Sequence, residues 1–183
     1  MQLTVQATNR QVDLIEESFD IVVRGVTGGL ESSGLVQARL CTASWRLVAS
    51  PAYLAQAGPI QGVARLPELD LLLYASINDT APVLRLIGPD GEAIGTPVRA
   101  RLQSDNTSVL KQAALAGTGI ASLPLYGCAD ELKSGALRVV LVLPEWRPKE
   151  GQLAVLFPTR RGLVPAVRAL VDFLKAELPL RVN

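Results

Sequence analysis

Residues 104–124 read SDNTSVLKQAALAGTGIASLP, and this stretch specifies more local structure than any other part of the chain. Its leading residues, Ser104 to Thr107, are small and polar, and such side chains favour the N-cap of a helix. An apolar stripe with helical spacing follows, and Gly117 suits the position just after a helix. Ile120–Leu123 then has the pattern of a buried strand that ends at Pro124. The stretch therefore predicts a polar loop, a short helix, a tight turn and a strand.

The N-terminus of this predicted helix could hold a small anion or polar ligand. Helix N-termini present unpaired N–H groups and the positive end of the helix dipole, and nearby hydroxyl and amide groups add donors. A purely structural explanation is also open, in which Asp105 or Asn106 only caps the helix. The turn Gly117-Thr118-Gly119 does not fit a dinucleotide-binding loop, because Ser122 stands where the third glycine belongs and the glycines follow a helix instead of a strand.

Composition and charge narrow the classes of function. The 183 residues are 49% hydrophobic and 19% charged, which is enough for a sizeable core in one domain or two small lobes. The net charge of +1 gives no electrostatic footprint for nucleic acid. The chain has no histidine, which removes the commonest general base and zinc ligand and leaves only carboxylate or lysine chemistry open to an enzyme. We predict no catalytic residue, no metal and no cofactor.

Cys41 and Cys128 stand alone and in no C-x-x-C pattern, so we expect reduced, buried thiols. No apolar run approaches the length of a membrane span, and the first residues lack the pattern of a secretory leader. The sequence therefore predicts a cytoplasmic chain that does not enter a membrane.

The rest of the chain alternates predicted strands and helices, which indicates an α/β fold. The continuous apolar run at 19–25 suggests a parallel sheet covered on both faces, and Gly88-Pro89-Asp90-Gly91 suits the turn of a hairpin. Strands are expected at 3–7, 19–25, 35–40, 45–49, 69–74, 84–87, 93–102, 137–143 and 153–157. Helices are expected at 12–17, 128–134 and 165–178, and after Ser50, an N-cap that precedes a proline.

Two predicted helices carry informative side chains. Glu16 and Glu17 are adjacent, so they point in different directions on a helix and are interpreted as solvated. The helix at 165–178 has one apolar face, which should pack on a sheet, on a partner or on both. That face is formed by Val167, Leu170, Val171, Leu174 and Leu178.

Five segments, in their order and spacing, resemble the C-terminal effector-binding domain of LysR-type transcriptional regulators. They are residues 10–24 (RQVDLIEESFDIVVR), 47–54 (LVASPAYL), 88–92 (GPDGE), 104–124, and 157–161 (FPTRR) before the last helix. The resemblance runs along the whole chain. It implies a two-lobed, periplasmic-binding-protein-like (type II) α/β fold with an effector cleft between the lobes. Lobe I would comprise residues 1–47 and 148–183, and lobe II residues 48–147.

The resemblance also implies which residues bind the effector. In lobe II the polar end of the helix that begins near Thr107 would point into the cleft. In lobe I, Arg24 would be the counter-charge of an anionic effector, or would instead form an internal ion pair with an acidic side chain. The full set implied is Ser104, Asp105, Asn106, Thr107, Arg24, Gly25, Ile120, Phe157 and Thr159.

The chain departs from the family pattern at its start. The match begins at the second strand of lobe I, so the family's winged helix-turn-helix, its first strand and its first helix have no counterpart; the last two amount to roughly 30 residues, the size of a βαβ unit. Lobe I is therefore expected to be incomplete, with unpaired strand edges and an uncovered apolar face on the last helix. We expect weakened ligand binding and either marginal stability or association through that lobe.

The function implied is that of an effector-sensing regulatory domain. It would bind a small anionic or aromatic organic ligand and mediate formation of a homodimer or higher homo-oligomer. DNA would be bound only through the winged helix-turn-helix of an intact regulator. Two other functions stay open, namely a transport receptor of the same fold and an α/β enzyme.

Overall fold

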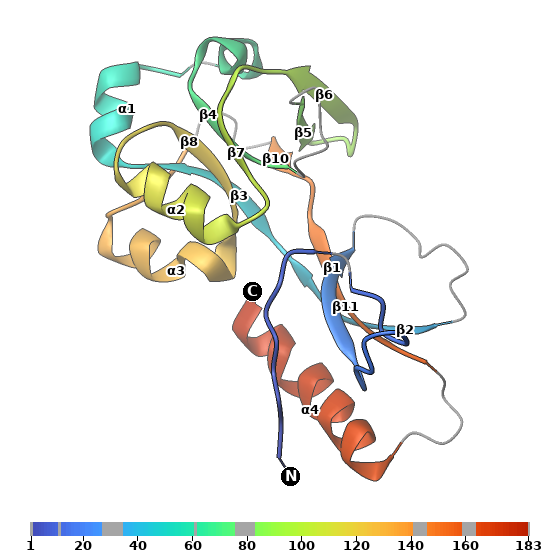
Figure 1. The fold of residues 1–183 in the computed structure, drawn as a ribbon. Helices are drawn as coiled ribbons and strands as arrows, with labels where there is room; N and C mark the ends of the chain where they lie inside the picture. The colour runs from blue at the N-terminus through green and yellow to red at the C-terminus, as the bar shows by residue number, and fades with distance from the viewer. Residues whose placement is uncertain are drawn as a thin grey trace. The chain divides into compact units, whose positions relative to one another are not determined.

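The computed structural model describes residues 2–10, 12–26, 35–60, 62–75, 83–140, 146–158 and 164–182. The chain divides into two compact units, which Figure 1 colours by residue number. Unit 1 contains Met1–Ala43 and Gly151–Asn183, and unit 2 contains Ser44–Glu150. The lobe boundaries predicted above stay predictions. In the part of the chain that is described, no helix has the length and apolar character needed to cross a membrane.

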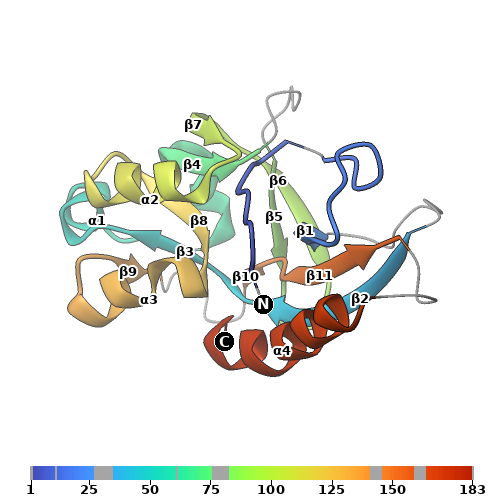
Figure 2. The ribbon, with the colours of Figure 1, turned by 60° about the horizontal axis from the view of Figure 1, so that its bottom comes forward.

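Unit 1 contains a sheet of three described strands and one long helix. The strands are β1 (Val22–Val26), β2 (Val36–Ala43) and β11 (Gly151–Phe157), in the order β1-β11-β2 with both pairs antiparallel. Helix α4 (Pro165–Val182) packs on β2, and Figures 1 and 2 both show it beside this sheet. The core between them contains Leu40, Cys41, Ala43, Val155, Phe157, Val171 and Val182.

The prediction that residues 19–25 belong to a parallel sheet with both faces covered is wrong. Strand β1 is antiparallel to β11, and the Val23 side chain is 44% exposed. A continuous apolar run shows that a segment is suited to a strand, but the direction of its neighbour depends on distant parts of the chain.

The first residues do not form the strand predicted at 3–7. Residues 2–8 have no regular structure, and Leu3 and Val5 are 54% and 85% exposed. An alternating sequence forms a strand only beside a partner strand, and the described residues provide none for this segment.

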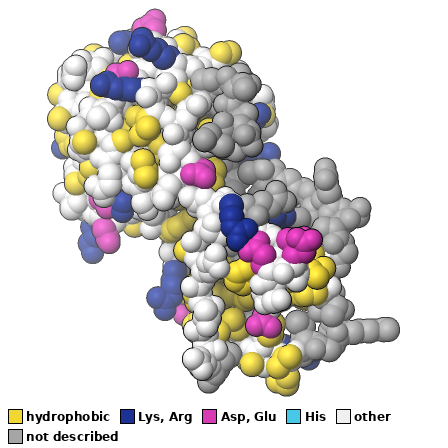
Figure 3. Space-filling model, viewed as in Figure 1, with side chains coloured by type: hydrophobic (Ala, Val, Ile, Leu, Met, Phe, Trp, Pro, Cys, Tyr) yellow, Lys and Arg dark blue, Asp and Glu magenta, His cyan; other side chains and the backbone are white. Residues whose placement is uncertain are grey.

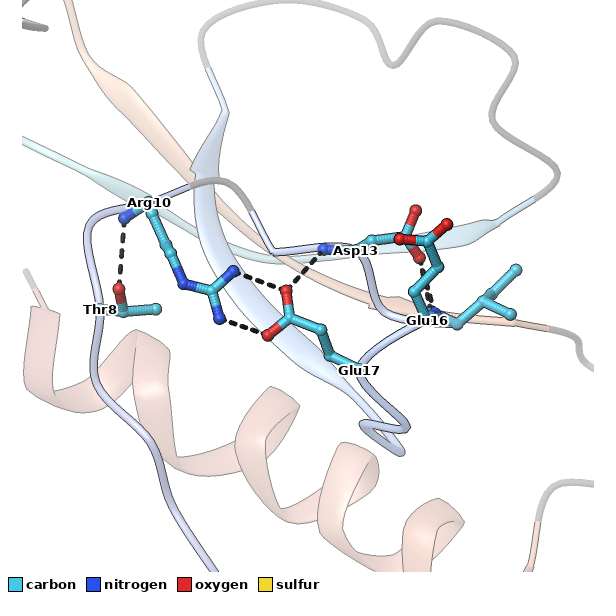
Figure 4. A network of polar contacts seen from close by, with 6 residues as sticks. Thr8, Arg10, Asp13, Glu16 and Glu17 are labelled. Atoms are coloured by element: carbon cyan, nitrogen blue, oxygen red, sulfur yellow. Dashed lines mark hydrogen bonds and ion pairs between the residues drawn. The ribbon is translucent and has the colours of Figure 1, made fainter.

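The segment predicted as a helix at 12–17 forms a single turn. Asp13 Oδ1 accepts hydrogen bonds from the backbone N–H groups of Ile15 (2.9 Å) and Glu16 (3.0 Å), as an aspartate does when it caps a turn. Both carboxylate oxygens of Glu17 accept hydrogen bonds from the Arg10 guanidinium, as Figure 4 shows. Glu17 is therefore ion-paired, which corrects its interpretation as a merely solvated residue, and the hydrogen bond from Arg10 lowers the pKa of Glu17.

Unit 2 is built around a five-stranded sheet of order β7-β4-β8-β3-β9. The strands are β7 (Ala100–Ser104), β4 (Leu71–Tyr74), β8 (Ile120–Pro124), β3 (Trp45–Ala49) and β9 (Arg138–Val139). Strand β4 is parallel to β7 and β8, and β3 is antiparallel to β8 and β9. Successive residues of β3 and β4 alternate between two separate cores, so both faces of this sheet are covered.

One face of the sheet packs against helices α2 (Thr107–Leu115) and α3 (Leu125–Ser134). The core on the other face includes residues of helix α1 (Pro51–Ala57) and of the 3-10 helix η1 (Val63–Glu68). A second sheet of order β10-β5-β6 contributes to that core. Its strands are β10 (Arg147–Pro148), β5 (Val83–Ile87) and β6 (Ala93–Pro97).

Several local predictions for unit 2 are confirmed. Ser50 caps α1 by accepting a hydrogen bond from Tyr53 N–H, with a proline at the first helical position. Gly117 follows α2 with a φ of 76°, the left-handed conformation that favours glycine. Strands β5 and β6 form the predicted hairpin, closed by a bond from Gly91 N–H to Gly88 O at 3.1 Å.

Other segments differ in extent from the prediction. The strand expected at 93–102 is divided into β6 and β7, which belong to different sheets. Helix α4 continues to Val182, four residues past its predicted end at 178. Of the strand expected at 137–143, Arg138–Val139 forms β9, and residues 141–145 lie outside the described residues.

Candidate functional site

Helix α2 begins directly after β7, at the carboxyl edge of the five-stranded sheet. Its N-cap is Asn106, whose Oδ1 accepts a hydrogen bond from Ser108 N–H at 2.9 Å. Ser104 Oγ accepts a hydrogen bond from Asn106 N–H at 3.1 Å. The capping role left open for Asn106 is therefore present. The Thr107 N–H, the first of the helix, and the side-chain Nδ2 of Asn106 take no part in this cap and can act as donors.

The polar residues at this helix end differ in what they offer a ligand. Asp105 is exposed, and its carboxylate would repel an anion placed beside it. Ser104 and Thr107 are half-buried, and each has a hydroxyl group. The N–H and O–H groups at this helix end can donate hydrogen bonds to a carboxylate or carbonyl oxygen of a ligand. The carboxylate of Asp105 is an unfavourable neighbour for an anionic ligand.

Two aromatic residues that the sequence analysis did not single out lie at the same sheet edge. Tyr74 ends β4 and is paired in register with Ser104 of β7. Its ring contacts that of Trp45 edge to face, with centroids 5.8 Å apart and the planes at 64°. Tyr74 is 53% exposed. The only sequence signal was an aromatic residue at the end of an apolar strand, because the contact joins residues far apart in the chain.

Arg24 lies in the middle of β1, opposite Ala154 of β11. Its Nε is buried and has no hydrogen-bond partner among the described residues. In the same part of the chain, no carboxylate lies within ion-pair distance of Arg24, so the internal ion pair considered above is not found there. A buried N–H donor without an acceptor is unfavourable, which distinguishes Arg24 from the other predicted site residues.

The remaining predicted site residues have different environments. Gly25 is exposed in β1, with nothing near the place where a side chain would begin. Ile120 and Phe157 are 0% and 5% exposed and belong to the cores of unit 2 and unit 1. Thr159 lies outside the described residues. Arg24, Ser104, Asn106 and Thr107 are therefore the described members of the predicted set whose side chains carry hydrogen-bond donors.

An ion pair holds α2 against α3. Lys111 Nζ lies 2.7 Å from Glu131 Oε1, and both side chains are mostly buried, at 24% and 22% exposure. The hydrogen bond from Lys111 lowers the pKa of Glu131. This contact links α2 to α3, beside the core that packs both helices on the sheet.

The thiols and the surface charges show no sign of metal or redox chemistry in the described residues. Cys41 and Cys128 are free and buried, as predicted, and burial raises the pKa of both thiols. No group of three acidic, cysteine or histidine side chains in the described ranges could hold a metal ion. On the face shown in Figure 3, basic and acidic side chains are interspersed, without a continuous basic patch among the described atoms.

Comparison with known proteins gives a consistent result. The LysR substrate binding domain family matches residues 1–179. The chain is 29% identical over 178 residues to the HTH-type transcriptional regulator PtxR of Pseudomonas aeruginosa, covering 97% of this chain and 55% of that protein. It thus spans about half the length of the curated relatives it matches.

Solved structures agree with the sequence relatives. The regulatory domain of AphB from Vibrio vulnificus, treated with cumene hydroperoxide, has a TM-score of 0.70 and 26% identity, covering 96% of this chain and 83% of that one. The CrgA regulatory domain from Neisseria meningitidis has a TM-score of 0.70 and 26% identity, covering 90% of this chain and 78% of that one.

Proposed function

The chain belongs to the LysR substrate-binding domain family, and from that premise we propose that it senses a small organic acid and passes the signal to the DNA-binding part of a bacterial transcriptional regulator. The predicted fold class, a two-lobed periplasmic-binding-protein-like α/β fold, is confirmed by this membership and by the regulatory domains it resembles. The family and its named relatives are transcriptional regulators, which supports the prediction that the chain is not an enzyme and weakens the transport alternative.

The observation that carries the choice of an anionic ligand is the environment of Arg24. Its Nε is buried without a partner, and no carboxylate in the described residues neutralises its charge. Arginine binds carboxylates through paired hydrogen bonds that are stronger than neutral ones. The proposal assigns the ligand's acidic group to Arg24. It keeps Ser104, Asn106 and Thr107 as further effector-binding residues, through their N–H and hydroxyl donors.

The partners proposed follow from the family. A ligand that binds one arrangement of the two units better than another shifts the population toward that arrangement, and a winged helix-turn-helix outside these 183 residues would read the shift on DNA in the cytoplasm. Self-association is supported by α4, which leaves Phe173 and Leu180 58% and 76% exposed. Light scattering after size-exclusion chromatography tests this part, since a stable monomer at all concentrations would contradict it.

The ligand part is tested by a thermal-shift screen of small organic acids and aromatic compounds. A ligand that binds only the folded chain raises its melting temperature by mass action. Each hit is then measured by calorimetry against Arg24→Gln, Asn106→Ala and Thr107→Val, with Arg101→Gln as a matched control, because Arg101 is an exposed arginine already paired with Asp70 at 3.2 Å. Unchanged affinity in all three site variants would show that the site is wrongly assigned.

A further inference from the structure

We propose that Arg39 is a second anion-binding residue beside Arg24, and that the ligand therefore carries two carboxylates. This inference rests on the proposed function, because it names the ligand class for the site that contains Arg24. It uses only residues of unit 1.

The strand register places the two arginines on one face of the sheet. Arg24 of β1 is opposite Ala154 of β11, and Ala154 is in turn opposite Arg39 of β2. Residues directly opposite each other in antiparallel strands project from the same face, and two strand spacings separate the arginine backbones by roughly 10 Å. Ala154 lies between them, contributes only a methyl group and is fully buried, so a ligand would bridge the guanidinium groups at the ends of the two side chains. Two arginine side chains can therefore reach opposite ends of one small molecule.

Arg24 and Arg39 project from the face of the unit 1 sheet that does not pack against α4. Val155 and Phe157 of β11 belong to the core with Val171 of α4. Side chains alternate along a strand, so Ala154 projects from the opposite face, and Arg24 and Arg39 project with it.

Neither arginine is neutralised inside the described part of unit 1. None of the ion pairs found there involves Arg24 or Arg39. Arg39 Nη2 donates a hydrogen bond to Thr42 Oγ1, which orients the guanidinium and leaves its other N–H groups as donors. Arg24 contributes the buried, unpartnered Nε. A ligand with a single acidic group would leave one of the two charges unpaired, whereas a dicarboxylate would pair both.

The test compares glutarate with pentanoate, which has the same five carbons and one carboxylate fewer. Calorimetric titration of the protein is expected to give about tenfold or greater preference for glutarate, since a hydrogen bond to a charged group contributes on the order of a tenfold change in affinity or more. Arg39→Gln should weaken glutarate binding about tenfold and change pentanoate binding less than about twofold. Arg24→Gln should weaken both, and Arg39→Lys should retain part of the preference.

Arg39 is exposed, so its substitution should not affect folding, and circular dichroism verifies this for each variant. Arg101→Gln in unit 2 is the control and should leave both affinities unchanged. Inorganic phosphate is a third probe, and phosphate binding more tightly than glutarate would overturn the assignment to a dicarboxylate. Two results would overturn this inference and leave the proposed function standing. One is equal binding of glutarate and pentanoate, and the other is a preference for glutarate that Arg39→Gln does not change. Binding of none of the probes at millimolar concentration would overturn the proposed function with it.

Discussion

The backbone carbonyl of Asp70 lies where a side chain on Gly119 would have to stand. Asp70 O accepts a hydrogen bond from Ile120 N–H at 2.9 Å, and a Cβ built on Gly119 would lie 2.5 Å from the same oxygen. The contact joins the start of β4 to the start of β8, the two parallel strands at the centre of the unit 2 sheet. The second glycine of the Gly-x-Gly turn thus serves close packing of backbone against backbone and has no need of a cofactor.

Gly119→Ala is therefore expected to lower the free energy of unfolding by about 1–3 kcal/mol, as overpacking in a core does. The midpoint of urea unfolding, followed by circular dichroism, measures this. Gly127→Ala is the matched control, because a Cβ there would make an ordinary 3.4 Å contact with Pro124 inside a helix and should be neutral or stabilising. Equal stability of the two variants would contradict the packing argument.

The Lys111–Glu131 pair predicts a pH dependence of stability. Because the pKa of Glu131 is lowered in the folded chain, its contribution is present at neutral pH and is lost as the pH falls below the ordinary value for glutamate, about 4.3. Glu131→Gln should cost no more than about 1 kcal/mol at pH 7 and should flatten the fall in stability between neutral and acidic pH. An identical pH profile in wild type and variant would show that the pair contributes nothing.

Cys128 is expected to resist thiol reagents. It is fully buried, its Sγ lies 3.5 Å from Pro124 O, and burial raises its pKa, so little reactive thiolate forms at neutral pH. Mass spectrometry after treatment with iodoacetamide should find Cys128 unmodified in the folded protein and modified in urea. Rapid modification of Cys128 without denaturant would contradict the buried placement.

The contact between Trp45 and Tyr74 provides a spectroscopic report on the end of α2. The chain has two tryptophans, so in a Trp146→Phe variant Trp45 is the only source of tryptophan fluorescence. A ligand that contacts Ser104 lies beside Tyr74 in the strand register and is expected to change that emission. Tyr74→Leu should alter the emission of the free protein and reduce the response to ligand. A calorimetrically verified ligand that leaves Trp45 emission unchanged would place the binding event elsewhere.

The sequence allowed prediction of those parts that depend on neighbouring residues. Asn106 and Gly117 define both ends of α2 because a cap and a left-handed glycine act within one turn of the chain. The same holds for Ser50 at the start of α1. Strand pairing cannot be predicted in this way. Leu3 and Val5 alternate with polar residues as a strand would, yet they are exposed and have no partner strand among the described residues. The antiparallel direction of β1 was missed for the same reason.

Only part of the candidate site could be predicted from the sequence. Residues 104–107 are contiguous, so a helix cap could be identified from their types alone. The pairing of Tyr74 with Ser104, and of Arg24 and Arg39 with Ala154, depends on strand register. Between strands that no hairpin turn joins, register pairs residues that are distant in the chain, and the residue types of one strand do not identify the opposite residue.

The proposed site depends most on Arg24, whose guanidinium is expected to bind the carboxylate of an organic acid. Nitrogen-15 NMR tests it most directly, by titrating glutarate, or the organic acid selected by the screen, into the labelled protein. The resonance of Arg24 Nε–H is expected to shift along one saturation curve, while the resonance of Arg101 Nε–H does not move. Saturable binding that leaves the Arg24 Nε–H resonance unmoved would contradict this assignment.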